Sequence, residues 1–418
     1  MSIPPPTVLI VGGGHAGIET AFGLRAAGFP GRVHILSQDR ELPYERPPLS
    51  KAWLKGKAEL QDLYFRNADV YAAQNIELST GTRVTAIDRE RRHVVCADGS
   101  RAAYDHLVLA TGARPRQLPV PGADLDGVHC LHTYPDAARI ATALDRARSV
   151  VIVGGGFIGL EVAAAAAERG RDVVVLEAAD RVMQRAVTAV TSTFYQRLHG
   201  AAGTRIRCGT VAREIVGRQG RVHAVRTGDG EEIPADLVVV GIGAVPADEL
   251  AAAAGLRVAD GIVVDAFLRT TDPAVFAVGD CARFPREEQG HLRLESVQNA
   301  VGHGRALART LTATPEPYRE IPWFWTDQLG CKLQMAGLTS DHDEHTVIGD
   351  PEAKKFTVLC WKRGELVGGE SVNRPGDHIA LRTLLAVPTA LPPGAVPGRD
   401  FDLKAYARTA ATAARTRV

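Results

Sequence analysis

Two copies of one short pattern, an apolar run followed by a glycine-rich turn, constrain the fold of this chain more than any other feature. The first copy is TVLIVGGGHAG at residues 7–17, and the second is SVVIVGGGFIG at residues 149–159. Each apolar run predicts a strand that helices cover on both faces, and the turn leads into a helix whose first N–H groups can bind phosphate. Another strand follows each copy, RVHILS at 32–37 and DVVVL at 172–176. The sequence therefore predicts an α/β protein with two Rossmann-like dinucleotide-binding domains.

In each copy the first glycine permits a tight turn, the second lets the backbone approach a pyrophosphate, and the third lets the helix pack on the strand. These glycines are Gly12, Gly14 and Gly17 in the first copy, and Gly154, Gly156 and Gly159 in the second. Glu177 ends the strand after the second copy, where a carboxylate can accept hydrogen bonds from both ribose hydroxyls. The matching position in the first copy is Gln38, an uncharged acceptor, and the adjacent Asp39 can replace it if the strand end bends. The alternative is a doubly wound fold without a cofactor.

Two further segments distinguish between the cofactors. YDHLVLATGARPR (104–116) is a strand ending in small residues, including Thr111 and Gly112, which allow a flat ligand to approach. AVGDCARF (277–284) is a strand ending in Gly279 and Asp280, and this aspartate can accept a hydrogen bond from the ribityl chain that FAD has and NAD lacks. Each segment alone also fits a surface turn. Because the second glycine loop lies between them, the first dinucleotide fold is expected to be discontinuous, with FAD as its cofactor.

Composition excludes several other classes. A length of 418 residues exceeds one ordinary domain, and a net charge of +1 argues against nucleic acid as a partner. The apolar stretch 150–167 contains three consecutive glycines and Glu161, so a strand, turn and helix explain it better than a membrane span. The N-terminus lacks the pattern of a signal peptide, which predicts a cytoplasmic protein. Six well-separated cysteines form neither a disulfide framework nor a metal motif.

With these motifs the chain resembles the flavoprotein reductases with two dinucleotide-binding domains, and more closely the putidaredoxin reductase-like ferredoxin reductases of bacterial oxygenase systems. The resemblance extends over essentially the whole chain. The segments that carry it are GGGHAG (12–17), LPYERPPLSKAWL (42–54), ATGARPR (110–116), VIVGGGFIGLEVA (151–163), GIGAVP (241–246), AVGDCARF (277–284), ESVQNA (295–300) and WFWTDQ (323–328). The last is more restricted to this family than the glycine loops are.

The resemblance implies an architecture and an activity. Residues 1–115 and 248–320 would form the FAD domain, 116–247 the inserted NAD domain, and 321–418 a C-terminal α/β domain that covers the flavin. The implied activity is FAD-dependent transfer of electrons from NADH, one at a time, to a 2Fe–2S ferredoxin that feeds a cytochrome P450 or a dioxygenase. A monomer or weak dimer is expected. The alternatives are a rubredoxin reductase, an NADH oxidase, or an NADH-sensing interaction protein like apoptosis-inducing factor.

The resemblance also assigns residues to each cofactor. For FAD they are Gly12, Gly14, Ala16, Gly17, Gln38, Asp39, Arg46, Lys51, Val84, Thr111, Gly112, His132, Gly279, Asp280 and Val297. For NAD they are Gly154, Gly156, Phe157, Ile158, Gly159, Glu161, Glu177, Arg185, Gly243, Glu295 and Trp325. No metal ligand is expected. His132 departs from the family, which has arginine there, so its contact with FAD would be weaker and pH-dependent.

Lys51 and Glu161 are the expected catalytic residues. In the family the lysine lies near the flavin N5 atom, although a lysine after ERPPLS would by itself be read as a solvated residue. Glu161 lies on the apolar face of the helix GLEVAAAAA, where an unpaired carboxylate is costly, so it needs a partner. We expect Lys51 to be that partner.

Overall fold

The computed structural model describes residues 5–286, 290–387 and 391–415 of the 418-residue chain. Within it the chain divides into two compact units, each built from three stretches. The first unit comprises Met1–Arg46, Glu59–Arg114 and Ala244–Glu320, and the second comprises Pro47–Ala58, Pro115–Gly243 and Ile321–Val418. This division is coarser than the four ranges expected from the sequence, which stay a prediction.

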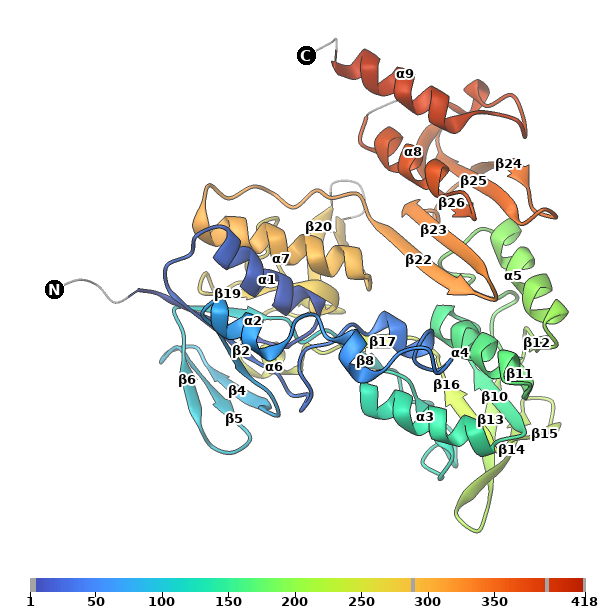
Figure 1. Cartoon of the computed structure of the whole chain (residues 1–418), viewed down its shortest axis with the longest axis horizontal. Helices are drawn as coiled ribbons and strands as arrows, with labels where there is room; N and C mark the ends of the chain where they lie inside the picture. Colours follow the sequence, from blue (N-terminus) through green and yellow to red (C-terminus); the bar gives the residue numbers. More distant parts are fainter. Residues whose placement is uncertain (1–4, 287–289, 388–390, 416–418) are drawn as a thin grey trace. The chain divides into compact units, whose positions relative to one another are not determined.

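A parallel five-stranded sheet in the order β19-β7-β1-β2-β3 forms the centre of the first unit. Its strands are β1 (Thr7–Val11), β2 (Arg32–Leu36), β3 (Ile76–Ser79), β7 (His106–Leu109) and β19 (Val275–Ala277). Helices α1 (His15–Ala26) and α7 (Val297–Thr312) pack against each other, and Figure 1 shows them side by side in blue and orange. Because β19 pairs with β7, neighbouring strands of this sheet come from before and after the second glycine loop.

The remaining elements of the first unit are short. They are the antiparallel strands β4 (Val84–Asp88), β5 (His93–Cys96) and β6 (Arg101–Ala103), the strands β18 (Ile262–Val263), β20 (Ala282–Arg286) and β21 (Gly290–Leu292), the helices α2 (Ala68–Ala73) and α6 (Glu249–Ala253), and the 3₁₀ turns η2 (Leu60–Leu63) and η3 (Gly279–Cys281). Strand β8 (Ala113–Pro115) pairs with β17 (Ala244–Pro246).

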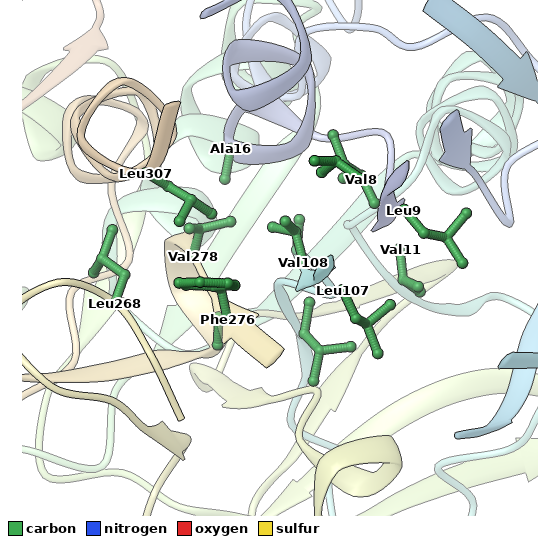
Figure 2. Packing of buried hydrophobic residues seen from close by; sticks show 14 of the residues in the cluster. Val8, Leu9, Val11, Ala16, Leu107, Val108, Leu268, Phe276, Val278 and Leu307 are labelled. Atoms are coloured by element: carbon green, nitrogen blue, oxygen red, sulfur yellow. The ribbon is translucent and has the colours of Figure 1, made fainter. Parts of the chain in front are cut away.

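The core of the first unit lies between its sheet and the packed helices. Figure 2 shows Val108 of β7, Phe276 of β19 and Leu307 of α7 gathered in this core with Ala16 at the start of α1. Burying each large apolar side chain stabilises the fold by about 1.5–3 kcal/mol relative to exposure. The core therefore fixes the carboxyl ends of β1 and β19, from which the glycine loop and the Gly279–Asp280 turn emerge.

The second unit contains another parallel sheet, in the order β12-β11-β10-β16-β9. Its strands are β9 (Val128–Cys130), β10 (Ser149–Val153), β11 (Asp172–Leu176), β12 (Arg205–Arg207) and β16 (Leu237–Val240). The helices are α3 (Tyr134–Arg146), α4 (Phe157–Glu168) and α5 (Ala189–Ala201), and an antiparallel sheet is formed by β13 (Ala212–Arg218), β14 (Arg221–Thr227) and β15 (Glu232–Pro234). The 3₁₀ turn η1 (Pro47–Ser50) belongs to the same unit.

The C-terminal part of the second unit is an antiparallel sheet covered by helices. The strands, in the order β22-β23-β26-β25-β24, are β22 (Trp323–Gln328), β23 (Cys331–Gly337), β24 (Glu344–Asp350), β25 (Lys355–Lys362) and β26 (Glu365–Val372). Helix α8 (Pro375–Leu385) packs on β23, β26 and α9 (Leu403–Arg415), and η4 (Pro393–Ala395) is a 3₁₀ turn. Trp361 is fully buried, and its indole N–H donates to the carbonyl oxygen of Leu391 at 2.8 Å. Two parallel sheets and a C-terminal α/β part confirm the predicted fold class.

Candidate active site

The glycines of the first loop differ in what surrounds them. Gly12 has φ +120°, and a Cβ atom there would overlap the carbonyl oxygen of Ala110. A Cβ on Gly17 would overlap the carbonyl oxygen of Gly12, whereas one on Gly14 would have no atom within 4 Å. The first and third glycines are therefore required by the fold itself, and the second borders open space.

The second loop repeats this arrangement. Gly154 has φ +108° and a Cβ there would overlap the carbonyl oxygen of Gly241, while a Cβ on Gly159 would overlap that of Gly154. At Gly156 the nearest atom would be the Gly241 oxygen, at 3.9 Å. Glycine is also the N-cap residue of both helices, Gly14 for α1 and Gly156 for α4. Since glycine has no side chain to bond the first N–H groups, they remain available to phosphate, and both loops fit a dinucleotide.

Glu177 lies beside the second loop. Its carboxylate accepts hydrogen bonds from the backbone N–H groups of Gly155, at 2.7 Å, and Ala179, at 2.8 Å. The Arg185 guanidinium lies close to Gly243, because a Cβ on that glycine would be 3.3 Å from Nη2. The structure thus places Glu177 at the turn and brings Arg185 to Gly243, all of them residues expected to bind NAD.

Asp39, not Gln38, makes the specific contact beside the first loop. The carboxylate of Asp39 forms an ion pair with Arg46, with Oδ2 and Nη2 3.0 Å apart, and Gln38 is exposed just after β2. His15, within the loop, packs edge-on against Phe65 with ring centroids 4.7 Å apart. Burial, with a smaller contribution from Arg46, lowers the pKa of His15 to about 4, so this histidine is neutral at physiological pH.

Asp280 follows β19 in a turn that His303 holds. The Gly279 N–H donates to Nδ1 of His303 at 3.1 Å. Burial raises the pKa of Asp280 to about 7, the negative charge of Glu295 adds to this, and Arg293 and Arg46 oppose it. A hydroxyl that donates to this carboxylate would favour its ionised form. The structure therefore places the predicted residues Asp280, Glu295 and Arg46 in one electrostatic neighbourhood.

Lys51 and Glu161 form an ion pair within the second unit. Lys51 Nζ lies 2.8 Å from Glu161 Oε2, and the side chains are 20% and 4% exposed. The hydroxyl of Ser50 donates to the same oxygen, and the hydroxyl of Thr326 donates to Oε1 at 2.5 Å. Thr326 was not expected from the sequence. The only signal in the sequence was a polar residue directly after the aromatic start of WFWTDQ.

Several other predicted residues border helix ends or aromatic groups. Phe157, at the start of α4, packs on Phe324 with centroids 4.6 Å apart, and the neighbouring Ile158 is 50% exposed. Trp325 lies 5.6 Å from Trp323, centroid to centroid. His132 precedes Thr133, whose side chain caps α3. Ile158 is therefore an exposed apolar side chain in the first turn of α4, which follows the glycine loop directly.

The remaining candidates for FAD occupy positions in the first unit. The Thr111 hydroxyl donates to the carbonyl oxygen of Ala247 at 2.6 Å, and Gly112 has φ +71°. Val84 starts β4, and Val297 is the first residue of α7. Of the FAD candidates, Lys51 and His132 belong to the second unit, and of the NAD candidates, Glu295 belongs to the first.

The cysteines carry no disulfide. All six lie in the described residues and are free. Cys281, next to Asp280, is buried and its thiol donates to the carbonyl oxygens of Leu109 and Val278 at 3.4 and 3.3 Å. Burial raises its pKa, so this thiol is poorly reactive. Within the described ranges no cluster of metal-binding side chains is found, and no helix there is long and apolar enough to cross a membrane.

Comparison with protein families decides the relationship of the chain. Residues 6–304 match the family described as pyridine nucleotide-disulphide oxidoreductase. The chain belongs to that family. Residues 323–407 match a second family, described as reductase C-terminal. The family uses FAD and a nicotinamide dinucleotide, the two cofactors that the sequence predicts.

Similar proteins cover nearly the whole chain. Rhodocoxin reductase of Rhodococcus erythropolis is 46% identical over 95% of this chain and 93% of its own length. The structure resembles the ferredoxin reductase for the CYP199A2 system from Rhodopseudomonas palustris, with a TM-score of 0.93, 44% identity and coverage of 96% and 100% of the two chains. It also resembles the covalent putidaredoxin reductase–putidaredoxin complex, with a TM-score of 0.92, 40% identity and coverage of 98% and 99%. The predicted resemblance to putidaredoxin reductase-like enzymes is confirmed.

The similar proteins include a reductase that is named for a different protein, rubredoxin. A rubredoxin-NAD(+) reductase of Pseudomonas putida is 39% identical over 91% of this chain and 99% of its own length. A rubredoxin reductase, one of the alternatives drawn from the sequence, is thus also found among the proteins similar to this chain.

Proposed function

We propose that this chain is an FAD-dependent NADH:ferredoxin reductase that supplies single electrons to a 2Fe–2S ferredoxin serving a cytochrome P450 or a dioxygenase. The observation that carries the proposal is the match over nearly its whole length to a ferredoxin reductase of a CYP199A2 system, a structure with TM-score 0.93. When bound, FAD supplies a group that accepts two electrons together and releases them singly.

The residues divide this work between binding and positioning. We propose that the N–H groups at the starts of α1 and α4 bind the two pyrophosphates, and that Glu177 binds the ribose of NADH. Asp280 would accept a hydrogen bond from the ribityl chain, and the N-terminus of α7 would stabilise negative charge on the isoalloxazine ring. The Lys51 ammonium, fixed by Glu161, would act beside that ring.

We propose that electrons leave the flavin without passing through a pair of cysteines, although the name of the family mentions a disulphide. The segment from Gly12 to Lys51 contains no cysteine, so the redox-active pair of disulphide reductases is missing from its place in the sequence. Cys281 is buried and has no cysteine close to it in sequence with which to form a disulfide. The cysteine pair that electron transfer through a disulfide requires is therefore absent from these positions. Transfer would go directly to the iron–sulfur protein.

The proposed function predicts a specific order of reactivity. The FAD-loaded protein should be reduced rapidly by NADH, consume oxygen slowly, and turn over rapidly once a 2Fe–2S ferredoxin of a P450 system is added. Stopped-flow absorbance and steady-state cytochrome c reduction measure these rates. Rapid oxygen consumption without a carrier would indicate an NADH oxidase, and faster turnover with a rubredoxin than with any ferredoxin would indicate a rubredoxin reductase. Slow reduction by NADH in every case would favour a sensing protein.

We predict a preference for NADH over NADPH that depends on Glu177. At an effective dielectric constant near 20, a 2′-phosphate about 4 Å from the carboxylate is repelled by about 4 kcal/mol before screening, and a quarter of this gives about fivefold discrimination. Glu177→Gln removes the charge and keeps one oxygen, which can still accept from one of the two backbone N–H groups, that of Gly155 or that of Ala179. The ratio of kcat/KM for NADH to that for NADPH should fall at least about fivefold. Glu214→Gln, on β13 in the same unit, is the control; an unchanged ratio in Glu177→Gln would refute the assignment.

A further inference from the structure

A chain of buried hydrogen bonds continues from Glu161 into the interior of the second unit. Thr326 donates to Glu161 Oε1 at 2.5 Å, Gln328 Nε2 donates to Thr326 Oγ1 at 3.0 Å, and His199 Nε2 lies 2.9 Å from Gln328 Oε1. Thr326, Gln328 and His199 are at most 1% exposed. We call the His199–Gln328–Thr326 series the relay.

Which group donates in each hydrogen bond of the relay can be worked out from Glu161, the carboxylate at which the series ends. An ionised carboxylate only accepts, so the Thr326 hydroxyl donates its hydrogen to Glu161. Thr326 can then only accept from Gln328, which turns the amide NH₂ toward Thr326 and the amide oxygen toward His199. His199 must therefore carry its hydrogen on Nε2. Burial lowers the pKa of His199, so the ring is neutral, and it supplies a dipole instead of a charge.

The relay joins three elements that are distant in sequence. Thr326 and Gln328 are two residues apart on β22, so they lie on the same face of the strand, while Glu161 comes from α4 and His199 from α5. Helix α4 packs against β22. The C-terminal sheet thus contributes one donor, the Thr326 hydroxyl, to a carboxylate of the nucleotide-binding fold within one compact unit.

The two carboxylate oxygens have separate partners because of this arrangement. Oε2 accepts from Lys51 and Ser50, and Oε1 accepts from Thr326. Without the Thr326 hydroxyl, Oε1 would be a buried acceptor with no partner, which would destabilise the present orientation of the carboxylate. Rotation of the carboxylate toward Ser50 or Lys51 would relieve that destabilisation and move the ammonium. Nδ1 of His199 is buried and has no partner among the described residues, so the relay ends there.

We infer that the relay positions Glu161 and through it the Lys51 ammonium, so that Thr326, Gln328 and His199 are positioning residues for transfer of hydride from NADH. This inference rests on the proposed function only for its effect on hydride transfer. Its effect on Lys51 itself is a property of the polypeptide and holds with or without bound FAD.

Substitution of Thr326 tests the relay. Thr326→Val removes the hydroxyl at nearly constant volume, Thr326→Ser restores it, and Thr191→Val is the matched control, since the Thr191 side chain is buried in the same unit and its hydroxyl has no partner among the described residues. In Thr326→Val the rate of flavin reduction at saturating NADH should fall about tenfold with little change in the Kd for NADH. Thr326→Ser and Thr191→Val should stay within about twofold of the parent.

Acetylation of Lys51 provides a readout that does not need the reaction. Lys55, whose side chain is 23% exposed and paired with Glu168, is an internal reference for Lys51, which is 20% exposed. Brief treatment of the full chain with acetic anhydride, followed by peptide mass spectrometry, gives the ratio of the two rates. In Thr326→Val that ratio should rise at least about threefold, with and without FAD, because the ammonium is held less firmly.

The outcomes separate the relay from the proposed function. An unchanged acetylation ratio in a folded Thr326→Val protein overturns the relay, as does a slow Thr326→Ser protein, which would show that packing matters and not the hydroxyl. If Thr326→Val does not fold, Gln328→Met tests the same chain one bond further away, with the same direction expected for the acetylation ratio. If the parent protein itself is not reduced by NADH, the proposed function fails, while the acetylation result still decides the relay.

Discussion

Lys51→Met is expected to slow reduction of the bound flavin by NADH at least about a hundredfold and to destabilise the second unit by about 2 kcal/mol. Removing one partner of a buried ion pair leaves the other charge uncompensated, which typically costs about 3–5 kcal/mol. The lower value is expected here because Lys51 is 20% exposed and two hydroxyl groups continue to donate to Glu161. The loss of rate follows from loss of the positioned charge. Stopped-flow absorbance and urea unfolding measure the two effects.

Two further variants separate charge from packing. Lys55→Met removes a lysine of similar exposure whose partner Glu168 is 38% exposed, so it should cost less than about 1 kcal/mol and leave flavin reduction unchanged. The double variant Lys51→Met with Glu161→Gln removes both charges and keeps an amide oxygen that accepts from Thr326, so it should recover part of the stability without recovering the rate. A Lys51→Met protein that is reduced by NADH as fast as the parent would remove Lys51 from the proposed mechanism.

Local pattern accounts for the parts of the fold that the sequence predicted. The apolar runs before Gly12 and Gly154 became central parallel strands because both faces of each are covered. The roles of the glycines also follow from local geometry. The shape of the turn determines at which glycine an added Cβ would overlap the backbone and at which it would lie in open space. The need of Glu161 for a partner could be inferred because it is a carboxylate on an apolar helix face.

The relay could not be predicted for a physical reason. Its members come from α4, α5 and β22, and hydrogen bonds between such distant segments leave no periodic trace in a sequence. His199 in particular reads as an ordinary polar residue near the end of a helix. The segment Pro47–Ala58 is a similar case, because its grouping with the second unit depends on contacts such as Lys51 with Glu161.

Gly156→Ala provides the sharpest test of the second glycine loop. Gly156 has φ −79° and ψ −178°, which alanine adopts without strain, and an added Cβ would have only the Gly241 oxygen near it, at 3.9 Å. Replacing glycine by alanine at an N-cap costs only about 1 kcal/mol or less, so Gly156→Ala should fold with nearly the Tm of the parent. The methyl group would occupy the space in which the pyrophosphate approaches the backbone, and NADH binding should weaken at least about a hundredfold.

Gly159→Ala, three residues later, is the matched comparison. It should lower the stability of the fold, whereas Gly156→Ala should weaken NADH binding. A Cβ on Gly159 would overlap the carbonyl oxygen of Gly154 and lie 3.3 Å from Ile152 Cγ2, so the helix would be forced from the strand at a cost of about 1–3 kcal/mol. Thermal unfolding and calorimetric titration with NADH distinguish the two variants, and the FAD content after desalting should remain that of the parent in Gly156→Ala, because the first loop is untouched. Normal NADH affinity in a stable Gly156→Ala protein would mean that the pyrophosphate does not bind at this turn. Weakened NADH binding with an unchanged Tm is the expected result, because the space beside Gly156 is open in the protein and would be occupied by the pyrophosphate.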